Sequence, residues 1–381
     1  QQTVPGGIEF VRDAAKELSA RHPQLSAEVE SSAAAALAAL QEYGQWIHSV
    51  REQKLKEDVA AGPVVLARLV REWHGIDSSL DEIETLGWTL VQFFHDELDQ
   101  HARRIDPNAT WQQIMDRARE KFAASDRDML AEYRRVTENL RDRMARGDVL
   151  ELPPGESCKV ISTPAFLRAL LPTAAYTSPG PLDPRQIGVF FVSDPDPRLA
   201  ADAFRANVAQ HYGIEETCVH EAYPGHHVQL CWANRASSLV RQMADHIIFM
   251  EGWTLYCEQW MIEAGWFPDP VFKINYLVGQ LWRAYRMIID VGVHTRRMTV
   301  PQAVTMLMDG VGFTRERAVA ELNWYSQSPG VPLSYMMGKR DTRDLREAFL
   351  KRPGTGLRDF HSWLLQFGSV PQRWLREHLP T

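Results

Sequence analysis

The segment 220–227 constrains the fold most, because it reads His-Glu-Ala-Tyr-Pro-Gly-His-His and places a proline inside a predicted helix. Proline lacks a backbone N–H and its ring clashes with the preceding turn, so a helix kinks or bulges at such a position. Gly225 follows Pro224 and tolerates backbone dihedrals that other residues avoid. We therefore predict a distorted turn at 223–225.

The residue types in this segment are those that a catalytic zinc site uses. His220 and Glu221 open a pattern in which histidines at i and i+4 bind zinc and the glutamate is the general base. Here position i+4 is Pro224, which cannot bind a metal. In a regular helix His226 would point away from His220, and His227 would lie about 10 Å further along the same face. A two-residue bulge would bring His226 to the ligand position, and His227 is the alternative second ligand.

An acidic residue in the next apolar segment is the candidate third ligand. Residues 245–258 read as one long, mostly apolar helix that contains Glu251. A carboxylate is costly to bury unless a cation receives it, so we predict that His220, His226 and Glu251 bind Zn²⁺. Glu258 lies two turns further on the same side and could orient a histidine ligand.

Three protein ligands would leave a fourth zinc position for water, and Glu221 would take the proton of that water. A tetrahedral intermediate also needs a hydrogen-bond donor for its oxyanion, and the candidates are Tyr335 and His294. Tyr335 follows a loop rich in proline and glycine that could hold a phenol over a cleft. For both residues, packing inside the helical protein is the alternative role.

Two arginines are candidates for substrate binding. Arg283 and Arg286 lie three residues apart on one predicted helix face, with Asp290 one turn beyond. They either form an internal salt-bridge ladder with Asp290 or clamp a substrate carboxylate. The second arrangement would favour a carboxypeptidase or a dipeptidase.

Five motifs in order along the chain resemble those of the bacterial family of unknown function DUF885, which is grouped with the gluzincin zinc metallopeptidases. They are the segments 219–227, 251–258, 282–294, 333–338 and 368–371. The resemblance implies that His220, one of His226 or His227, and Glu251 bind zinc, and that Glu221 is the base. In gluzincins a tyrosine or a histidine stabilises the oxyanion.

Apolar residues recur at three- and four-residue spacing through most of the chain, which predicts helices. The exception is 150–195, which is rich in proline and glycine and contains candidate strands at 159–163 and 187–192. We expect a mainly α, zincin-like helical bundle with a small β-hairpin or short sheet around 159–192 beside the metal helix. Strand 187–192 would either hold an extended peptide as an edge strand or cap the bundle. Residues 1–150 would form an N-terminal helical region and 151–381 the metal-site region of one integrated domain.

Composition excludes several other classes of protein. The net charge is −7 and charges of both signs are interleaved, so no basic stripe indicates nucleic-acid binding. No run of 18 apolar residues predicts a membrane span. The four cysteines lack CxxC spacing, as in reducing compartments, and no signal peptide is visible, which favours the cytoplasm. The chain opens with Gln1 rather than Met, so the natural protein could begin earlier.

The sequence thus predicts a zinc-dependent hydrolase of peptide or amide bonds. One alternative is a zinc enzyme that acts on a non-peptide small molecule, by amide cleavage or cyclisation. Another is a non-catalytic binding relative, although a purely structural zinc would not need Glu221 beside its ligands. The substrate would be a peptide or a small amide, and no pattern indicates an oligomeric state.

Overall fold

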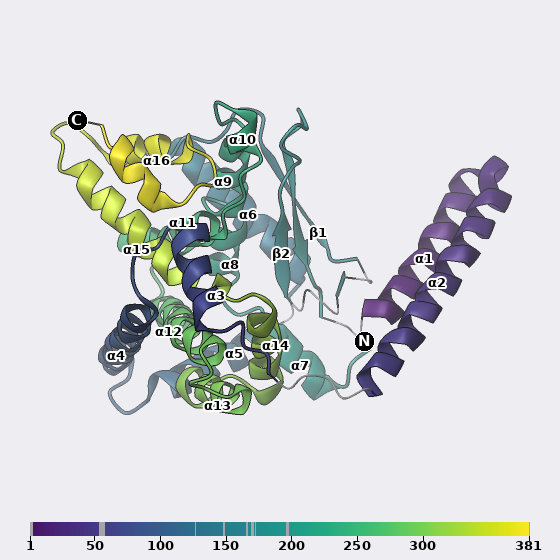
Figure 1. The fold of residues 1–381 in the computed structure, drawn as a ribbon, viewed down its shortest axis with the longest axis horizontal. Helices are drawn as coiled ribbons and strands as arrows, with labels where there is room; N and C mark the ends of the chain where they lie inside the picture. The colour runs from purple at the N-terminus through teal and green to yellow at the C-terminus, as the bar shows by residue number, and fades with distance from the viewer. Residues whose placement is uncertain are drawn as a thin grey trace. The chain divides into compact units, whose positions relative to one another are not determined.

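The computed structural model is mainly helical and carries one small sheet, which confirms the predicted fold class (Figure 1). It describes residues 3–52, 58–125, 127–147, 149–164, 167–168, 171, 173–195 and 198–380. Part of the predicted 159–192 hairpin region, namely 165–166, 169–170 and 172, lies outside the described residues.

The α-helices are α1 (Thr3–Arg21), α2 (Ser26–Glu52), α3 (Pro63–Arg68), α4 (Leu80–Ile105), α5 (Trp111–Ala123), α6 (Met129–Arg146), α7 (Ala201–Ala209), α8 (Ile214–Glu221), α9 (His226–Ala233), α10 (Leu239–Gln242), α11 (Ile247–Glu263), α12 (Pro270–His294), α13 (Val300–Val311), α14 (Arg315–Gln327), α15 (Val331–Leu350) and α16 (Leu357–Leu365). The shorter helical turns are η1 (Pro23–Leu25), the π-helical η2 (Leu69–Trp73) and η4 (Gln372–His378). The strands are β1 (Ser157–Ser162), β2 (Ala174–Thr177) and β3 (Ile187–Val192).

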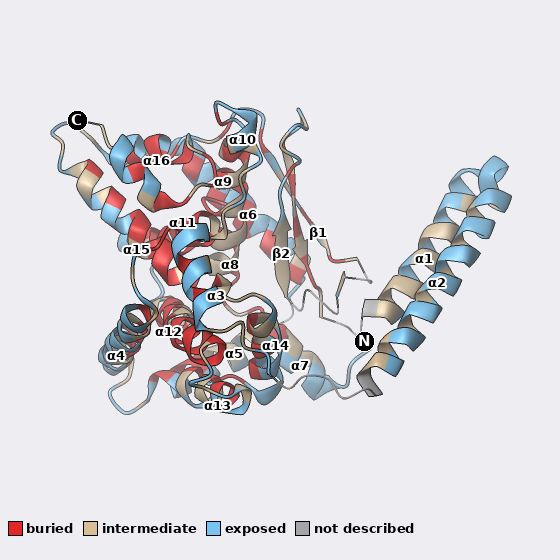
Figure 2. Cartoon of the chain, in the orientation of Figure 1, coloured by how far each residue is buried: buried red, intermediate tan, exposed pale blue. Residues whose placement is uncertain are grey.

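The chain forms two compact units. The smaller comprises 1–58, 161–175 and 191–194, and in it α1 packs along α2. No described residue of α1 or α2 is buried, so this hairpin has no core of its own (Figure 2). The larger unit comprises 59–160, 176–190 and 195–381 and contains every candidate site residue. The predicted boundary between an N-terminal helical region and a metal-site region, at residue 150, lies inside the larger unit. That division stays a prediction.

Polar caps define where the longer helices of the larger unit begin. The Ser79 side chain accepts the N–H of Glu82 at the start of α4, and the Glu82 carboxylate accepts the Ser79 N–H in return. At the start of α12 the Asp269 side chain accepts the N–H of Val271, with Pro270 in the first turn and no reciprocal bond. Such caps satisfy N–H groups that have no partner inside the helix.

Helices α11, α12 and α15 form the centre of the larger unit (Figures 1 and 2). Every residue of α11 from Glu251 to Glu258 is buried, so the helix has no solvent-facing side there. Its backbone touches that of α15, because a Cβ on Gly252 or on Gly338 would overlap the other helix. Only glycine permits so close an approach. Tyr335, one turn before Gly338, is thereby held on the side of α15 that faces α11.

The sheet has the strand order β1-β3-β2, which places β3 in the middle. The hypothesis that strand 187–192 is an edge strand is therefore wrong. Strand β2, which we did not predict, occupies one edge instead. Its four residues read Ala-Ala-Tyr-Thr and are too few to show a two-residue alternation.

No described helix is long and apolar enough to cross a membrane.

Candidate metal centre

The proline segment breaks one helix into two, where we had predicted a bulge. Helix α8 ends at Glu221 and α9 begins at His226. The turn between them contains a cis Tyr223–Pro224 peptide bond, and the buried indole N–H of Trp253 donates to the Pro224 carbonyl at 2.9 Å. A Cβ at position 225 would overlap the carbonyl oxygen of the last turn of α8, so the turn requires Gly225.

This turn brings two imidazoles together above α11. The ring centroids of His220 and His226 lie 4.9 Å apart, with their planes nearly perpendicular. Nε2 of His220 lies 3.3 Å from Oε2 of Glu251, and Nε2 of His226 lies 3.7 Å from Oε1 of the same carboxylate. One ligand atom from each residue falls within 4.8 Å of the other two. These three are the predicted zinc ligands.

The residues present fit a zinc ion. Two imidazole nitrogens and one carboxylate are the donor set of many catalytic zinc sites, and zinc bonds of about 2.0–2.2 Å are compatible with the observed separations. Oε2 of Glu251 is buried and has no well-directed hydrogen bond among the described residues. The side chains of all three residues nevertheless stay about a tenth exposed, at 12%, 12% and 10%, so water can reach them.

A buried hydrogen-bonded chain orients the first ligand. Nδ1 of His220 lies 2.7 Å from Oε1 of Glu258, whose other oxygen accepts from the Gln280 amide at 2.9 Å. Nζ of Lys339 in turn donates to the Gln280 carbonyl oxygen at 2.6 Å. Glu258 was expected in this role, whereas Gln280 and Lys339 were not. The sequence signal that could have found Lys339 is its position four residues after Tyr335, which puts both residues on the same face of the predicted helix.

The local charges favour a cation at this place. Burial alone would raise the pKa of Glu251, but His226 and His220 outweigh burial and lower it to about 2. Burial would lower the pKa of His220, yet the nearby carboxylates of Glu251 and Glu258 raise it to about 10. In the metal-free cluster a proton on His220 therefore lies between the carboxylates of Glu251 and Glu258, at the place where a metal cation would be held.

Glu221 has the electrostatic environment of a base that works near neutrality. Burial raises its pKa to about 7 and the charge of Glu251 adds to this effect, while His220 and the main-chain N–H of Tyr176 oppose it. Tyr176 belongs to β2, so the edge strand of the sheet lies against the candidate base.

His227, the alternative ligand, makes different contacts. Its ring is fully buried, with Nε2 2.7 Å from Glu156 and Nδ1 2.8 Å from the hydroxyl of Tyr176. A Cβ on Gly188 would overlap that hydroxyl, so β3 leaves space for the contact. The structure thus places His226, and not His227, beside the other two candidate ligands.

The two oxyanion candidates are placed differently. Tyr335 lies next to the cluster, since the charge of Glu251 adds to burial in raising the pKa of its hydroxyl. Nδ1 of His294 accepts the Ala61 N–H at 3.2 Å, and its Nε2 donates to the Tyr325 carbonyl at 3.1 Å. Both ring nitrogens of His294 are occupied by main-chain atoms, which is the pattern of a packing residue.

The two arginines predicted to bind substrate also differ in their contacts. Arg286 is 4% exposed and donates to the Tyr325 hydroxyl and to Glu321, both at 3.0 Å. Its guanidinium lies 4.6 Å from the ring centre of Tyr335. Arg283 bonds only to the Gly279 carbonyl, at 3.3 Å, among the described residues. A ladder through Asp290 does not form, since that carboxylate accepts the N–H groups of residues 330 and 333 instead.

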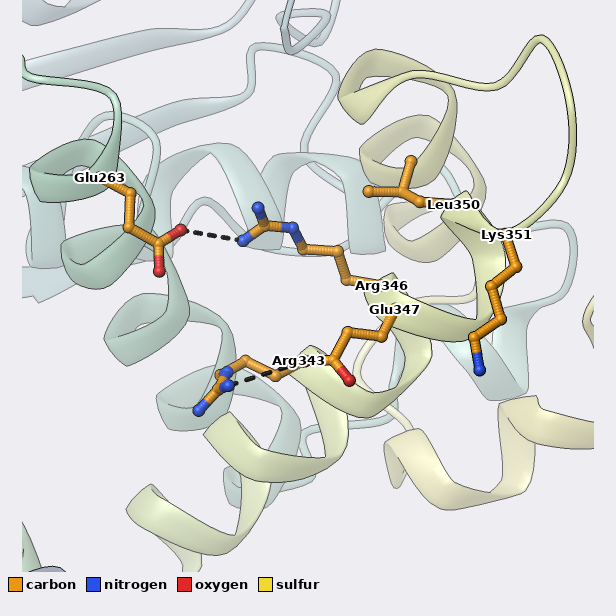
Figure 3. A pocket seen from close by; sticks show the side chains of 6 residues that line it. All are labelled: Glu263, Arg343, Arg346, Glu347, Leu350 and Lys351. Carbon is orange, nitrogen blue, oxygen red and sulfur yellow. Dashed lines mark hydrogen bonds and ion pairs between the residues drawn. The ribbon is translucent and has the colours of Figure 1, made fainter.

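A pocket of about 440 Å³ lies away from these residues, between the end of α11 and the second half of α15 (Figure 3). Its walls are mostly charged side chains that pair with each other, such as Arg346 with Glu263 at 3.2 Å. Its lining contains none of the candidate ligands, so it does not mark the metal centre.

Comparisons with solved structures show the same fold in two bacterial proteins. A "putative lipoprotein" from Colwellia psychrerythraea matches with a TM-score of 0.82 and 23% identity, over 98% of this chain and 65% of that chain. A "putative lipoprotein of unknown function" from Shewanella oneidensis matches with a TM-score of 0.73 and 20% identity, over 93% of this chain and 66% of that chain. This chain thus spans slightly less than two thirds of either protein.

No curated protein matches the chain. The family model described as "Bacterial protein of unknown function (DUF885)" matches residues 2–379, nearly the whole length. The chain therefore belongs to the DUF885 family.

Proposed function

We propose that this protein is a zinc-dependent hydrolase of peptide or amide bonds. The observation that carries the proposal is the convergence of His220, His226 and Glu251 beside a fourth group, Glu221, that is free to exchange protons. Structural zinc sites are usually closed by four protein ligands. This cluster has three, and it remains open to water.

Zinc bound to these ligands would supply a polarised water with a pKa of about 7. Glu221, next to a ligand in sequence, would take a proton from the attacking water and deliver it to the leaving amine. The Tyr335 hydroxyl would donate a hydrogen bond to the oxygen that becomes negative. The cation of Arg286 beneath the Tyr335 ring would favour that negative charge.

The sheet edge supports an extended substrate. Strand β2 has one side unpaired in the sheet, and its Tyr176 N–H already faces Glu221. An extended backbone that paired with this edge would run past the base. Peptides are therefore the first substrates to test.

The test combines metal analysis with digestion of a peptide library whose termini are free or blocked. Glu221→Gln is compared with Glu215→Gln, a matched change in the first turn of the same helix. We expect about one zinc per chain in both variants and a loss of about 10²- to 10⁴-fold in turnover in Glu221→Gln alone. Unchanged hydrolysis in Glu221→Gln, or failure of the protein to hold zinc, would contradict the proposal.

A further inference from the structure

Three guanidinium groups surround one indole ring close to the candidate metal centre. The Cζ atoms of Arg283 and Arg286 both lie 4.1 Å from the ring centre of Trp282, and that of Arg317 lies 5.2 Å from it. Two of these arginines come from α12 and one comes from α14. Stacking on an aromatic face holds each guanidinium in a defined orientation.

Only one of the three charges is neutralised by an ion pair. Arg286 pairs with Glu321. Within the part of the chain that the structure describes, neither Arg283 nor Arg317 forms an ion pair, and Nε of Arg283 is buried without a partner. Two unpaired cations that both lie within 5.2 Å of one ring centre repel each other, so an anion that contacts both would be stabilised.

Further positive charge surrounds the exposed Arg317 side chain. Desolvation by neighbouring protein atoms, opposed by Glu321, lowers the pKa of Arg317 to about 10, and Arg119, Arg283 and Arg286 add to the decrease. Arg119 belongs to α5, so three helices contribute to one concentration of positive charge.

A neighbouring carboxyl group, that of Glu216, does not pair with Arg283. A Cβ on Gly279 would lie 3.0 Å from Oε1 of Glu216 and 3.3 Å from Nη1 of Arg283, so the two groups are neighbours. They form no ion pair, however, and Glu216 instead accepts from the Asn275 amide at 2.5 Å. Burial raises the pKa of Glu216, which favours its neutral form.

Arg283 also lies on the side of the metal centre. Its guanidinium lies as close to the Trp282 ring centre as that of Arg286 does, and Arg286 lies 4.6 Å from the ring centre of Tyr335, the proposed oxyanion donor. A ligand group held by Arg283 would therefore lie near the bond to be cleaved.

We propose that Arg283 and Arg317 bind a carboxylate of the substrate. This inference rests on the proposed hydrolase function and narrows its substrate class to peptides or amides that carry a free carboxylate. The carboxylate is either the C-terminus of the substrate or the side chain of an Asp or Glu residue. Arg286, paired and enclosed, supports Tyr335 instead.

The experiment measures binding rather than turnover, in zinc-loaded Glu221→Gln protein. Isothermal titration calorimetry compares an N-acetylated tripeptide that has a free C-terminus with its C-terminal amide. A second pair of amidated peptides differs only by Asp against Asn. If Arg283 and Arg317 bind a carboxylate, the free acid should bind more tightly than its amide, or the Asp peptide more tightly than the Asn peptide. The expected difference is about 10- to 100-fold, as for hydrogen bonds to a charged group.

The same titrations are repeated with Arg317→Gln and Arg283→Gln added, and with Arg315→Gln as the matched control on α14. The first two changes should abolish the preference for the carboxylate, and the control should keep it. Thermal melts verify that each variant is folded. Equal binding of acid and amide by the parent protein, or a preference that survives both arginine changes, overturns the inference.

These binding results do not depend on hydrolysis. A preference for the carboxylate without any turnover in the wild-type protein would reject the hydrolase and keep the arginine site. Turnover by the wild-type protein without a preference for the carboxylate would keep the hydrolase and reject the arginine site.

Discussion

The carboxylate of Glu258 holds the ring of His220 in place, with Oε1 2.7 Å from Nδ1. The contact uses one ring nitrogen and leaves Nε2 directed towards Glu251, at 3.3 Å. Carboxylates that orient a histidine in this way also make it a stronger metal ligand. Helix α11 thus supplies both a candidate ligand and the group that orients another ligand, two turns apart.

We expect Glu258→Gln to weaken zinc binding by about 10- to 100-fold without unfolding the protein. The negative charge is lost, and the new amide would meet the amide donor of Gln280. Competition with a chelator measures the zinc affinity. Glu263→Gln, on the exposed end of α11, is the control and should bind zinc like the wild type. Equal zinc affinities of the two variants would show that Glu258 does not contribute to zinc binding.

The two adjacent histidines should respond differently to the same substitution. His226→Gln should lose zinc, because its Nε2 faces Glu251. His227→Gln should retain zinc, since that ring contacts Glu156 and Tyr176, and its activity should fall because Tyr176 and the edge of β2 would shift. Zinc content per chain decides between them. Loss of zinc in His227→Gln alone would reverse the assignment of the second ligand.

Gly338→Ala should destabilise the protein by about 1–3 kcal/mol, because the added methyl group would push α15 away from the Ile248 carbonyl. The displacement should also move Tyr335 from Glu251 and reduce turnover. Urea unfolding measures the free energy. Gly7→Ala on α1 is the control: its methyl group would make only ordinary contacts, with the Leu40 side chain at 3.8 Å. Similar effects of the two changes would show that the helix contact is not critical.

Stability should fall at acidic pH because His361 is buried in its neutral form. Burial lowers its pKa to about 4; Nε2 accepts from the Tyr256 hydroxyl at 2.8 Å and Nδ1 donates to the Val149 carbonyl at 2.6 Å. In the unfolded chain His361 takes up a proton near pH 6.5, whereas in the folded protein it does so only near pH 4. The free energy of unfolding is therefore highest above pH 6.5 and decreases as the pH falls towards 4. The loss is roughly 3 kcal/mol for this residue.

Urea unfolding of the wild type and of His361→Gln between pH 7 and pH 4 tests this expectation. The variant will be less stable at pH 7, and its free energy of unfolding should decrease less steeply with acid. Parallel pH profiles would assign the acid sensitivity to other groups.

Much of the fold and part of the site were predictable from local sequence. Helices follow from the spacing of apolar residues. His220 and Glu221 carry their chemistry in a short motif, and Glu251 was conspicuous as a charge inside an apolar helix. All of these signals lie within about two helical turns of sequence.

The remaining features depended on contacts between distant segments. The end of α8 and the start of α9, held by Gly225 and Trp253, decided which histidine lies beside Glu251. The order of the strands placed β3 in the centre of the sheet. The sequence of a strand does not by itself show which other strands it pairs with.

The sequence alone therefore determined the helical class and the chemical types at the candidate site, since both depend on residue identity and local periodicity. The tertiary structure decided which side chains meet. Arg317 and Lys339 come close to this site only because α14 and α15 pack around α12. Such packing depends on the shapes of surfaces far apart in the chain, for which a single sequence carries no local signal.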